Sequence, residues 1–282
     1  MRRSRLFGQK LLVVSVCAVL SVTGAVAQSL TWLGTLGGSW SEAHGVSADG
    51  SVVVGAAYNA SNGDRAFRWT PSGGMDDLGT LGGNFSEARG VSADGSVVVG
   101  SAQNASAQNR AFRWTPSGGM QDLGTLGGDR SWAYDVSADG SVVVGWAQNA
   151  SGRSRAFRWT PSGGMQDLGT LGGDSAARSV SADGRVVVGW AFNASGWERA
   201  FRWTPSGGME DLNAIAIGLT AGSRLEVASG ISPNGRYIVG SGFNAATDRY
   251  EAWIMDMVPE PASLLALGVG LAGVMVRRRR AA

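Results

Sequence analysis

Short stretches of alternating polar and apolar residues run through the middle of the chain, and they recur. Each stretch is four to seven residues long, which suits a β-strand better than a helix. A pair such as Asp94-Gly95 between two stretches is a strong signal for a two-residue hairpin turn. Between residues 28 and 257 no helical periodicity of useful length occurs. In the clearest copy we predict four strands, over residues 86–92, 96–102, 110–115 and 120–126.

Charged residues also recur in the last two strands of each copy. Arg113 in the third strand and Asp122 in the fourth are one example. We interpret such residues as candidates for structural ion pairs across the hairpin, each worth tenths of a kcal/mol to about 1 kcal/mol.

The same motifs return at a spacing of 44 or 45 residues, and of about 50 at the last copy. VSADG begins at Val46, Val91, Val136 and Val180, with a degenerate ISPNG at Ile231. The tryptophan of FRWTP falls at Trp69, Trp114, Trp159 and Trp203, and Trp253 is interpreted as the diverged fifth. Four short strands in a unit of this length match a blade of a β-propeller. A β-solenoid is the alternative, although its coils are usually shorter.

The two ends of the repeat array complement each other. The N-terminal stretch 30–36 matches a fourth strand without the first three, and the last copy, 226–255, has three strands without a fourth. Closure of a ring requires this complementarity, since the first strand can complete the last sheet. We therefore predict an all-β fold: a five-bladed β-propeller of four-stranded blades, closed by the N-terminal strand, over residues 28–257.

The first 27 residues have the three parts of a secretory signal peptide. Basic residues precede an apolar run, and Ala25-Val26-Ala27 is the small-x-small pattern that signal peptidase recognises. We expect a signal helix, export through the general secretion machinery and cleavage between Ala27 and Gln28. An uncleaved anchor helix is the alternative. The single cysteine, Cys17, lies in this segment, so a disulfide framework is excluded.

Residues 258–282 form a second targeting segment. Fifteen apolar residues form its centre, a length short of the roughly 30 Å hydrocarbon core of a membrane. The flanking motifs are Val258, Pro259, Glu260 and Pro261 on one side and Arg277, Arg278, Arg279 and Arg280 on the other. This order of elements resembles the PEP-CTERM sorting tail of Gram-negative bacteria. The resemblance implies a C-terminal membrane helix in the inner membrane, processing by an exosortase, and then display at the cell surface or in the extracellular matrix. An ordinary tail anchor is the alternative.

Composition excludes several kinds of function. The chain has one cysteine and one histidine, too few for a Cys/His zinc site. Eight of its 24 basic residues and one of its 22 acidic residues lie in the two targeting ends, so the body has 16 basic and 21 acidic residues and a net charge near −5. Nucleic acid is therefore not an expected partner. One aspartate per hairpin turn is too little for a calcium loop, and neither a metal nor a cofactor is expected.

The repeat unit itself resembles the HAF-type extracellular repeat of exported bacterial proteins. The segments LGTLGG, GVSADGSVVVG and AFRW carry this resemblance over residues 30–255. The family is named for His-Ala-Phe, and in this chain the histidine is replaced by Arg65, Arg110, Arg155, Arg199 and Glu251. The resemblance implies export and brings no assigned biochemical activity.

Positions that differ between copies are the candidates for binding, because the near-identical copies show what folding requires. Two residues before each VSADG valine the side chain changes from copy to copy, on the strand that usually lines the channel of a propeller. Aromatic side chains beside charged ones are typical of a surface that binds sugar or protein. Neutral drift between copies is the alternative. The tentative ligand face comprises His44, Arg89, Trp132, Tyr134, Trp146, Arg178, Trp190 and Trp197.

Together these observations predict an exported, non-catalytic repeat protein of the cell envelope or exopolysaccharide matrix that binds glycan or protein. Expected partners are the exosortase, the secretion machinery with its signal peptidase, the membrane before processing, and exopolysaccharide or other surface proteins. A propeller glycosidase is one alternative, but it needs two carboxylates at a set separation, and the unique acids form no recognisable motif, so no catalytic residue is assigned. A purely structural matrix component is the other alternative.

Overall fold

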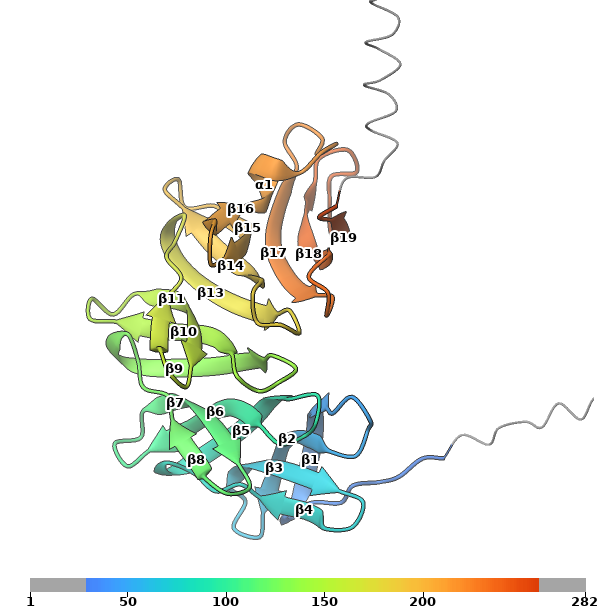
Figure 1. Cartoon of the computed structure of the whole chain (residues 1–282), viewed down its shortest axis with the longest axis vertical. Helices are drawn as coiled ribbons and strands as arrows, with labels where there is room; N and C mark the ends of the chain where they lie inside the picture. The colour runs from blue at the N-terminus through green and yellow to red at the C-terminus, as the bar shows by residue number, and fades with distance from the viewer. Residues whose placement is uncertain (1–28, 259–282) are drawn as a thin grey trace, which may run out of the picture. The chain divides into compact units, whose positions relative to one another are not determined.

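The computed structural model describes residues 29–258 of the 282-residue chain. Its strands form five antiparallel sheets, each built from consecutive strands (Figure 1). The first four sheets have four strands and the fifth has three, so the predicted all-β fold of five repeated sheets is confirmed. The predicted signal peptide, and the predicted sorting tail beyond Val258, lie outside the described residues. Among the described residues no helix is long and apolar enough to cross a bilayer.

Each sheet runs from its first strand outward in chain order. The first strands are β1 (Gly37–Val46), β5 (Gly82–Val91), β9 (Gly127–Val136), β13 (Gly172–Val180) and β17 (Arg224–Ile231). The second strands are β2 (Val53–Asn59), β6 (Val98–Asn104), β10 (Val143–Asn149), β14 (Val187–Asn193) and β18 (Tyr237–Asn244). The third strands are β3 (Asp64–Thr70), β7 (Asn109–Thr115), β11 (Ser154–Thr160), β15 (Glu198–Thr204) and β19 (Arg249–Asp256). The fourth strands are β4 (Gly74–Asp77), β8 (Gly119–Asp122), β12 (Gly164–Asp167) and β16 (Gly208–Asp211), and α1 (Leu212–Ile215) follows β16.

The VSADG motif makes the tight turn between the first and second strands. In the second sheet, Asp94 Oδ1 accepts hydrogen bonds from Ser92 Oγ at 2.6 Å and from the Ser96 amide at 3.0 Å. These bonds stabilise the ionised carboxylate and lower the pKa of Asp94 to about 2. Gly95 has φ 71°, a conformation that favours glycine. The aspartate and the glycine therefore have the turn-forming role expected of them.

The second and third strands place an aromatic ring over a glycine in every sheet. Gly100 lies opposite Phe112, and in the fifth sheet Gly240 lies opposite Trp253. Trp253 therefore occupies the phenylalanine position, and Met255 occupies the tryptophan position two residues later. The expectation that Trp253 continues the FRWTP tryptophan series is wrong. Two aromatic positions lie two residues apart in this strand, and the fifth copy keeps an aromatic residue at only one of them.

Neighbouring sheets pack face to face through apolar side chains. Val97 and Val99 of the second sheet share a cluster with Phe157 and Trp159 of the third. The third sheet packs on the fourth with the corresponding residues. The turns of adjacent sheets are also linked by single backbone hydrogen bonds, which run from Ala48 N to Ala93 O, from Ala93 N to Ala138 O, from Ala138 N to Ala182 O and from Ala182 N to Pro233 O. The core of the molecule therefore lies between the sheets, and it repeats with the sequence.

The N-terminal stretch does not complete the fifth sheet. Residues 29–35 form no strand, and the fifth sheet contains β17, β18 and β19 alone. The predicted closure by a strand over residues 30–36 is therefore not found. Part of this stretch is bound elsewhere: Ser41 Oγ donates to Gly34 O at 2.8 Å, and Leu36 forms a bridge with Asn59 in the first sheet. The second half of the stretch 30–36 thus corresponds to the link that precedes the first strand of the other sheets, and it is not a strand.

Candidate functional site

The first strands of all five sheets line one cavity of about 630 Å³. Along each first strand, side chains alternate between the packed core and the opposite face, so one position per sheet recurs beside the cavity. The lining residues are Ala43, His44, Arg89, Tyr134, Arg178, Val227 and Ser229. Four of the eight residues assigned to the ligand face are thus brought together from four different sheets.

His44 and Arg89 are held by a shared carboxylate. Glu87 Oε1 lies 2.8 Å from Arg89 Nη2 and 3.5 Å from His44 Nδ1. His44 Nδ1 is also 2.8 Å from the carbonyl oxygen of Ala88, and its Nε2 is 3.7 Å from Glu42 Oε2. The positive charge of Arg89 is therefore already balanced within this part of the cavity wall.

Arg178 has a different environment. Its guanidinium lies over the ring of Tyr134, 4.8 Å from the ring centroid. Among residues 29–258, no carboxylate lies within ion-pair distance of this guanidinium. A stacked arginine keeps its edge N–H groups available for a planar acceptor such as a carboxylate. Arg178 is therefore the group in the cavity best suited to an anionic ligand.

Tyr134 connects the cavity to two of the predicted tryptophans. Trp146 Nε1 donates to Tyr134 Oη at 3.0 Å, and the Trp146 ring stacks on Trp132 with centroids 4.4 Å apart and planes 15° apart. On β10, Trp146 shares a face with Val144, which packs against the fourth sheet. The two rings therefore lie half-buried between the third and fourth sheets, and the hydrogen bond from Trp146 fixes the position of the Tyr134 hydroxyl.

The remaining two tryptophans do not line the cavity. Trp190 on β14 contacts Phe192 edge to face, with centroids 5.5 Å apart. Trp197 lies in the loop between β14 and β15, has 52% of its surface exposed, and is covered on one side by Arg224 at 4.8 Å. The predicted ligand face is thus divided between the cavity with its supporting rings and separate aromatic sites.

Two acidic residues near the cavity were not assigned to the site from the sequence. Burial raises the pKa of Glu198, the charge of Glu226 adds to this effect, and Arg178 opposes it. Burial also raises the pKa of Asp135, next to Tyr134 in the chain. For Asp135 the signal was visible in the sequence, because no other copy has an acid at this position, whereas the first copy has Asp64 at the position of Glu198. No group of three or more possible metal-ligating side chains occurs within the described part of the chain.

The C-terminal residues 258–280 match the family model described as the PEP-CTERM protein-sorting motif. This match indicates an exported protein that is sorted by an exosortase, with a surface or extracellular location. It covers the tail and does not describe the repeat region. A comparison with curated protein sequences finds no significant match.

The fold is similar to that of solved TolB structures. TolB from Acinetobacter baumannii is 15% identical, with a TM-score of 0.54, over 77% of this chain and 52% of that chain. The protein assigned as TolB from Agrobacterium tumefaciens is 16% identical, with a TM-score of 0.55, over 77% of both chains. This chain thus spans about half the length of the first of them. At such identity the likeness describes a propeller-like fold and carries no function with it.

Proposed function

We propose that this protein is a non-catalytic binding protein of the cell envelope or exopolysaccharide matrix, and that its cavity binds an acidic glycan or a protein surface with acidic groups. The sorting tail and the resemblance of the repeat to HAF-type extracellular repeats support the location. The single observation that carries the binding proposal is Arg178, a cavity-lining guanidinium stacked on Tyr134, with no carboxylate of the described residues within ion-pair distance.

The cavity has the features that acidic sugars require. Arg178 offers paired N–H donors, and the Tyr134 hydroxyl, which accepts from Trp146, still has its own hydrogen to donate. Each of these groups differs from its counterpart in most of the sister copies, although the sister copies form the same sheet. Folding therefore does not require Arg178 or Tyr134 at these positions, and ligand binding would explain why they occur there.

The pair Glu198 and Glu226 supports the enzyme alternative, because a glycosidase needs two nearby carboxylates, one with a raised pKa. The pKa of Glu198 is raised, as the general acid of a glycosidase requires. Glu226, however, already forms an ion pair with Arg224 at 3.2 Å, and neither acid lines the cavity. Binding therefore remains the first proposal, and hydrolysis is tested beside it with Glu198→Gln.

Affinity electrophoresis through gels that contain an acidic or a neutral polysaccharide tests this proposal. We expect retardation by the acidic polysaccharide, and Arg178→Ala should weaken it about tenfold, since the charge-assisted hydrogen bonds are lost. Arg185→Ala is the matched control, because Arg185 is a largely exposed residue of the β13–β14 turn. Equal retardation of both variants would contradict a cavity site. Release of sugar that Glu198→Gln abolishes would favour the enzyme.

A further inference from the structure

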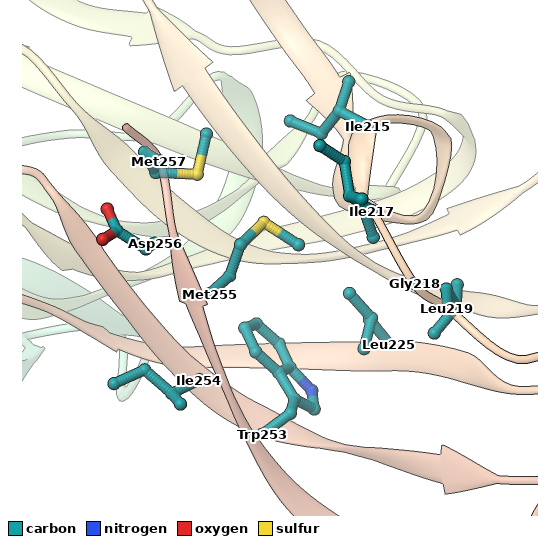
Figure 2. Close-up of a pocket in the computed structure, with 11 residues that line it drawn as sticks. Ile215, Ile217, Gly218, Leu219, Leu225, Trp253, Ile254, Met255, Asp256 and Met257 are labelled. Carbon is teal, nitrogen blue, oxygen red and sulfur yellow. The ribbon is translucent and has the colours of Figure 1, made fainter. Parts of the chain in front are cut away.

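The fifth sheet has an open edge beside an apolar groove. In the other four sheets the third strand is covered by a fourth, whereas β19 is the last strand of its sheet. A groove of about 430 Å³ lies between β19 and the segment 215–219, which begins at the last residue of α1. Trp253 and Met255 point into this groove toward Leu225, and Ile254 points away (Figure 2).

The sister sheets show what fits at this place. In the second sheet Met120 pairs with Trp114, and the Leu123 amide donates to the carbonyl oxygen of Ala111 at 2.9 Å. Leu123 is buried in the core, and Met120 packs against the neighbouring cluster. The third sheet repeats this arrangement with Leu168. The covering segment is thus an extended strand with apolar side chains three residues apart.

The chain contains one more segment of this kind. Residues 29–33, SLTWL, precede GTLGG as residues 119–123, GMQDL, precede an identical GTLGG. Leu30 corresponds to Met120, and Leu33 corresponds to Leu123. Leu30 is 80% exposed and Trp32 is 88% exposed. Two large apolar side chains therefore stand in water in a segment whose sequence matches a covering strand.

We propose that the edge of β19 binds residues 29–33 of a second copy of this chain as its fourth strand. The register of the second sheet places Leu30 opposite Met255 and Trp32 opposite Trp253. The Leu33 amide then donates to the carbonyl oxygen of Ala252, the counterpart of Ala111. Trp253 Nε1 is a second sign of a missing neighbour, because it is buried and has no hydrogen-bond partner among the described residues.

The exposed faces of the two terminal sheets favour a second copy as the occupant. Val46 in the first sheet is 60% exposed, whereas its counterpart Val136 is buried. Val239 in the fifth sheet is 42% exposed, whereas its counterpart Val144 is buried. Residues 34–38 lead directly from the donated strand into the first sheet. Strand donation between copies therefore brings the fifth sheet of one copy toward the first sheet of the other, and both apolar faces lose contact with water.

Disulfide trapping between two tagged full-length copies tests the register directly. Both copies carry Cys17→Ser, one carries Leu30→Cys with one tag, and the other carries Met255→Cys with a second tag. Opposed residues of antiparallel strands have Cα atoms about 4.5–5.5 Å apart, a distance that a disulfide spans. After mild oxidation we expect a covalent species that carries both tags and disappears on reduction.

A mismatched pair provides the control. Arg249→Cys lies at the far end of β19, so its cross-link to Leu30→Cys should be at least about fivefold weaker than that of Met255→Cys. A synthetic peptide of residues 28–36, added in excess, should reduce the cross-link of the matched pair. The proposal would be overturned if both pairs cross-link equally. It would also be overturned if the protein is soluble and the matched pair does not cross-link. A single chain that carries both Leu30→Cys and Met255→Cys provides the last comparison. If it forms only an internal disulfide and stays a monomer, the strand closes the sheet within one chain instead.

Discussion

Asp135 in the third sheet accepts a hydrogen bond from Ser179 in the fourth, with Oδ2 and Oγ 2.8 Å apart. The same carboxylate oxygen accepts the amide of Val180 at 3.0 Å. At the position of Asp135 three of the other copies have glycine, and the fourth copy has Ser179. Asp135 follows Tyr134 and Ser179 follows Arg178 in the chain, so this contact holds together the two strands that present the stacked tyrosine and arginine.

Asp135 should give the protein an unusual dependence of stability on pH. Burial raises the pKa of Asp135, so the folded protein holds the proton more tightly than the unfolded chain does. Its contribution to folding is therefore largest below the unfolded pKa of about 4 and is lost as the pH rises through the folded value. Asp135→Asn cannot ionise. We expect the melting temperature of the wild type, relative to this variant, to fall as the pH rises above about 4.

Asp94→Asn is the control for this experiment, with the opposite sign. The hydrogen bonds in its turn lower the pKa of Asp94 to about 2, so its contribution is present at neutral pH and is lost as the pH falls toward that value. Solvent screening at this exposed site keeps the effect small. Parallel melting curves for the wild type and Asp135→Asn would contradict the assigned role of burial.

Trp159 and Trp69 occupy the same position in two sheets but differ in burial. Trp159 is buried against the second sheet, whereas Trp69 in the first sheet has no preceding sheet among the described residues. Trp159→Ala should cost about 3–5 kcal/mol of unfolding free energy, and Trp69→Ala roughly half of that. Denaturant unfolding at concentrations where the chain is monomeric measures both. An equal cost would mean that another part of the same chain covers Trp69.

The repeat made most of the fold predictable from the sequence. Identical VSADG and FRWTP motifs place the turn and the third strand in the same way in the first four sheets, because local turn chemistry and side-chain alternation determine them. The fourth strand was predicted over 120–126, but β8 ends at Asp122. The Asp122 carboxylate accepts the amide of Gly124 at 2.8 Å, and this bond turns the chain out of the sheet. A local side-chain interaction thus ends the strand at Asp122, although the pattern that predicted a strand continues to residue 126.

The site was predictable only in part. The variable first-strand position correctly indicated that His44 and Arg178 line the same cavity, since strand alternation repeats in every copy. The predicted hairpin pairing of Arg113 with Asp122 is wrong for a non-local reason. Arg113 Nε donates to Gly140 O of the next sheet at 3.3 Å. Contacts between sheets depend on how the sheets stack, and a single copy of the repeat contains no information on that.

Trp132 and Trp146 should stabilise each other. Their rings stack at a centroid distance of 4.4 Å, and an aromatic pair contributes about 0.5–1.5 kcal/mol beyond simple burial. A double-mutant cycle with Trp132→Ala and Trp146→Ala should therefore give a coupling energy in this range. Trp190→Ala in place of Trp132→Ala is the control and should add to Trp146→Ala without coupling. Strict additivity of the first pair would show that the stack does not persist in solution.

The sorting tail can be tested independently of the repeat. Replacement of Pro259, Glu260 and Pro261 by alanine should leave export intact but prevent processing, because the exosortase no longer finds its motif. The precursor should then accumulate in the membrane fraction, and immunoblots of membrane and released fractions measure this outcome. Ser263→Ala, just beyond the motif, is the control and should be processed as the wild type is. Normal release of the triple variant would remove the assignment of the motif.

The series of backbone hydrogen bonds between turns ends at a proline. Ala138 N donates to Ala182 O at 3.1 Å, and Ala182 N donates to Pro233 O at 3.0 Å. Pro233 has no N–H, so the fifth sheet cannot extend the series to a further sheet. Its presence also shows that the turn accepts proline at this position.

Ala138→Pro should therefore remove one bond between sheets without breaking the turn. We expect a cost of about 1–3 kcal/mol in unfolding free energy, because the Ala182 carbonyl loses its donor. Pro233→Ala is the matched control and should change stability by less than about 0.5 kcal/mol. Thermal unfolding of both variants measures the difference, and equal stabilities would show that these bonds do not hold the sheets together.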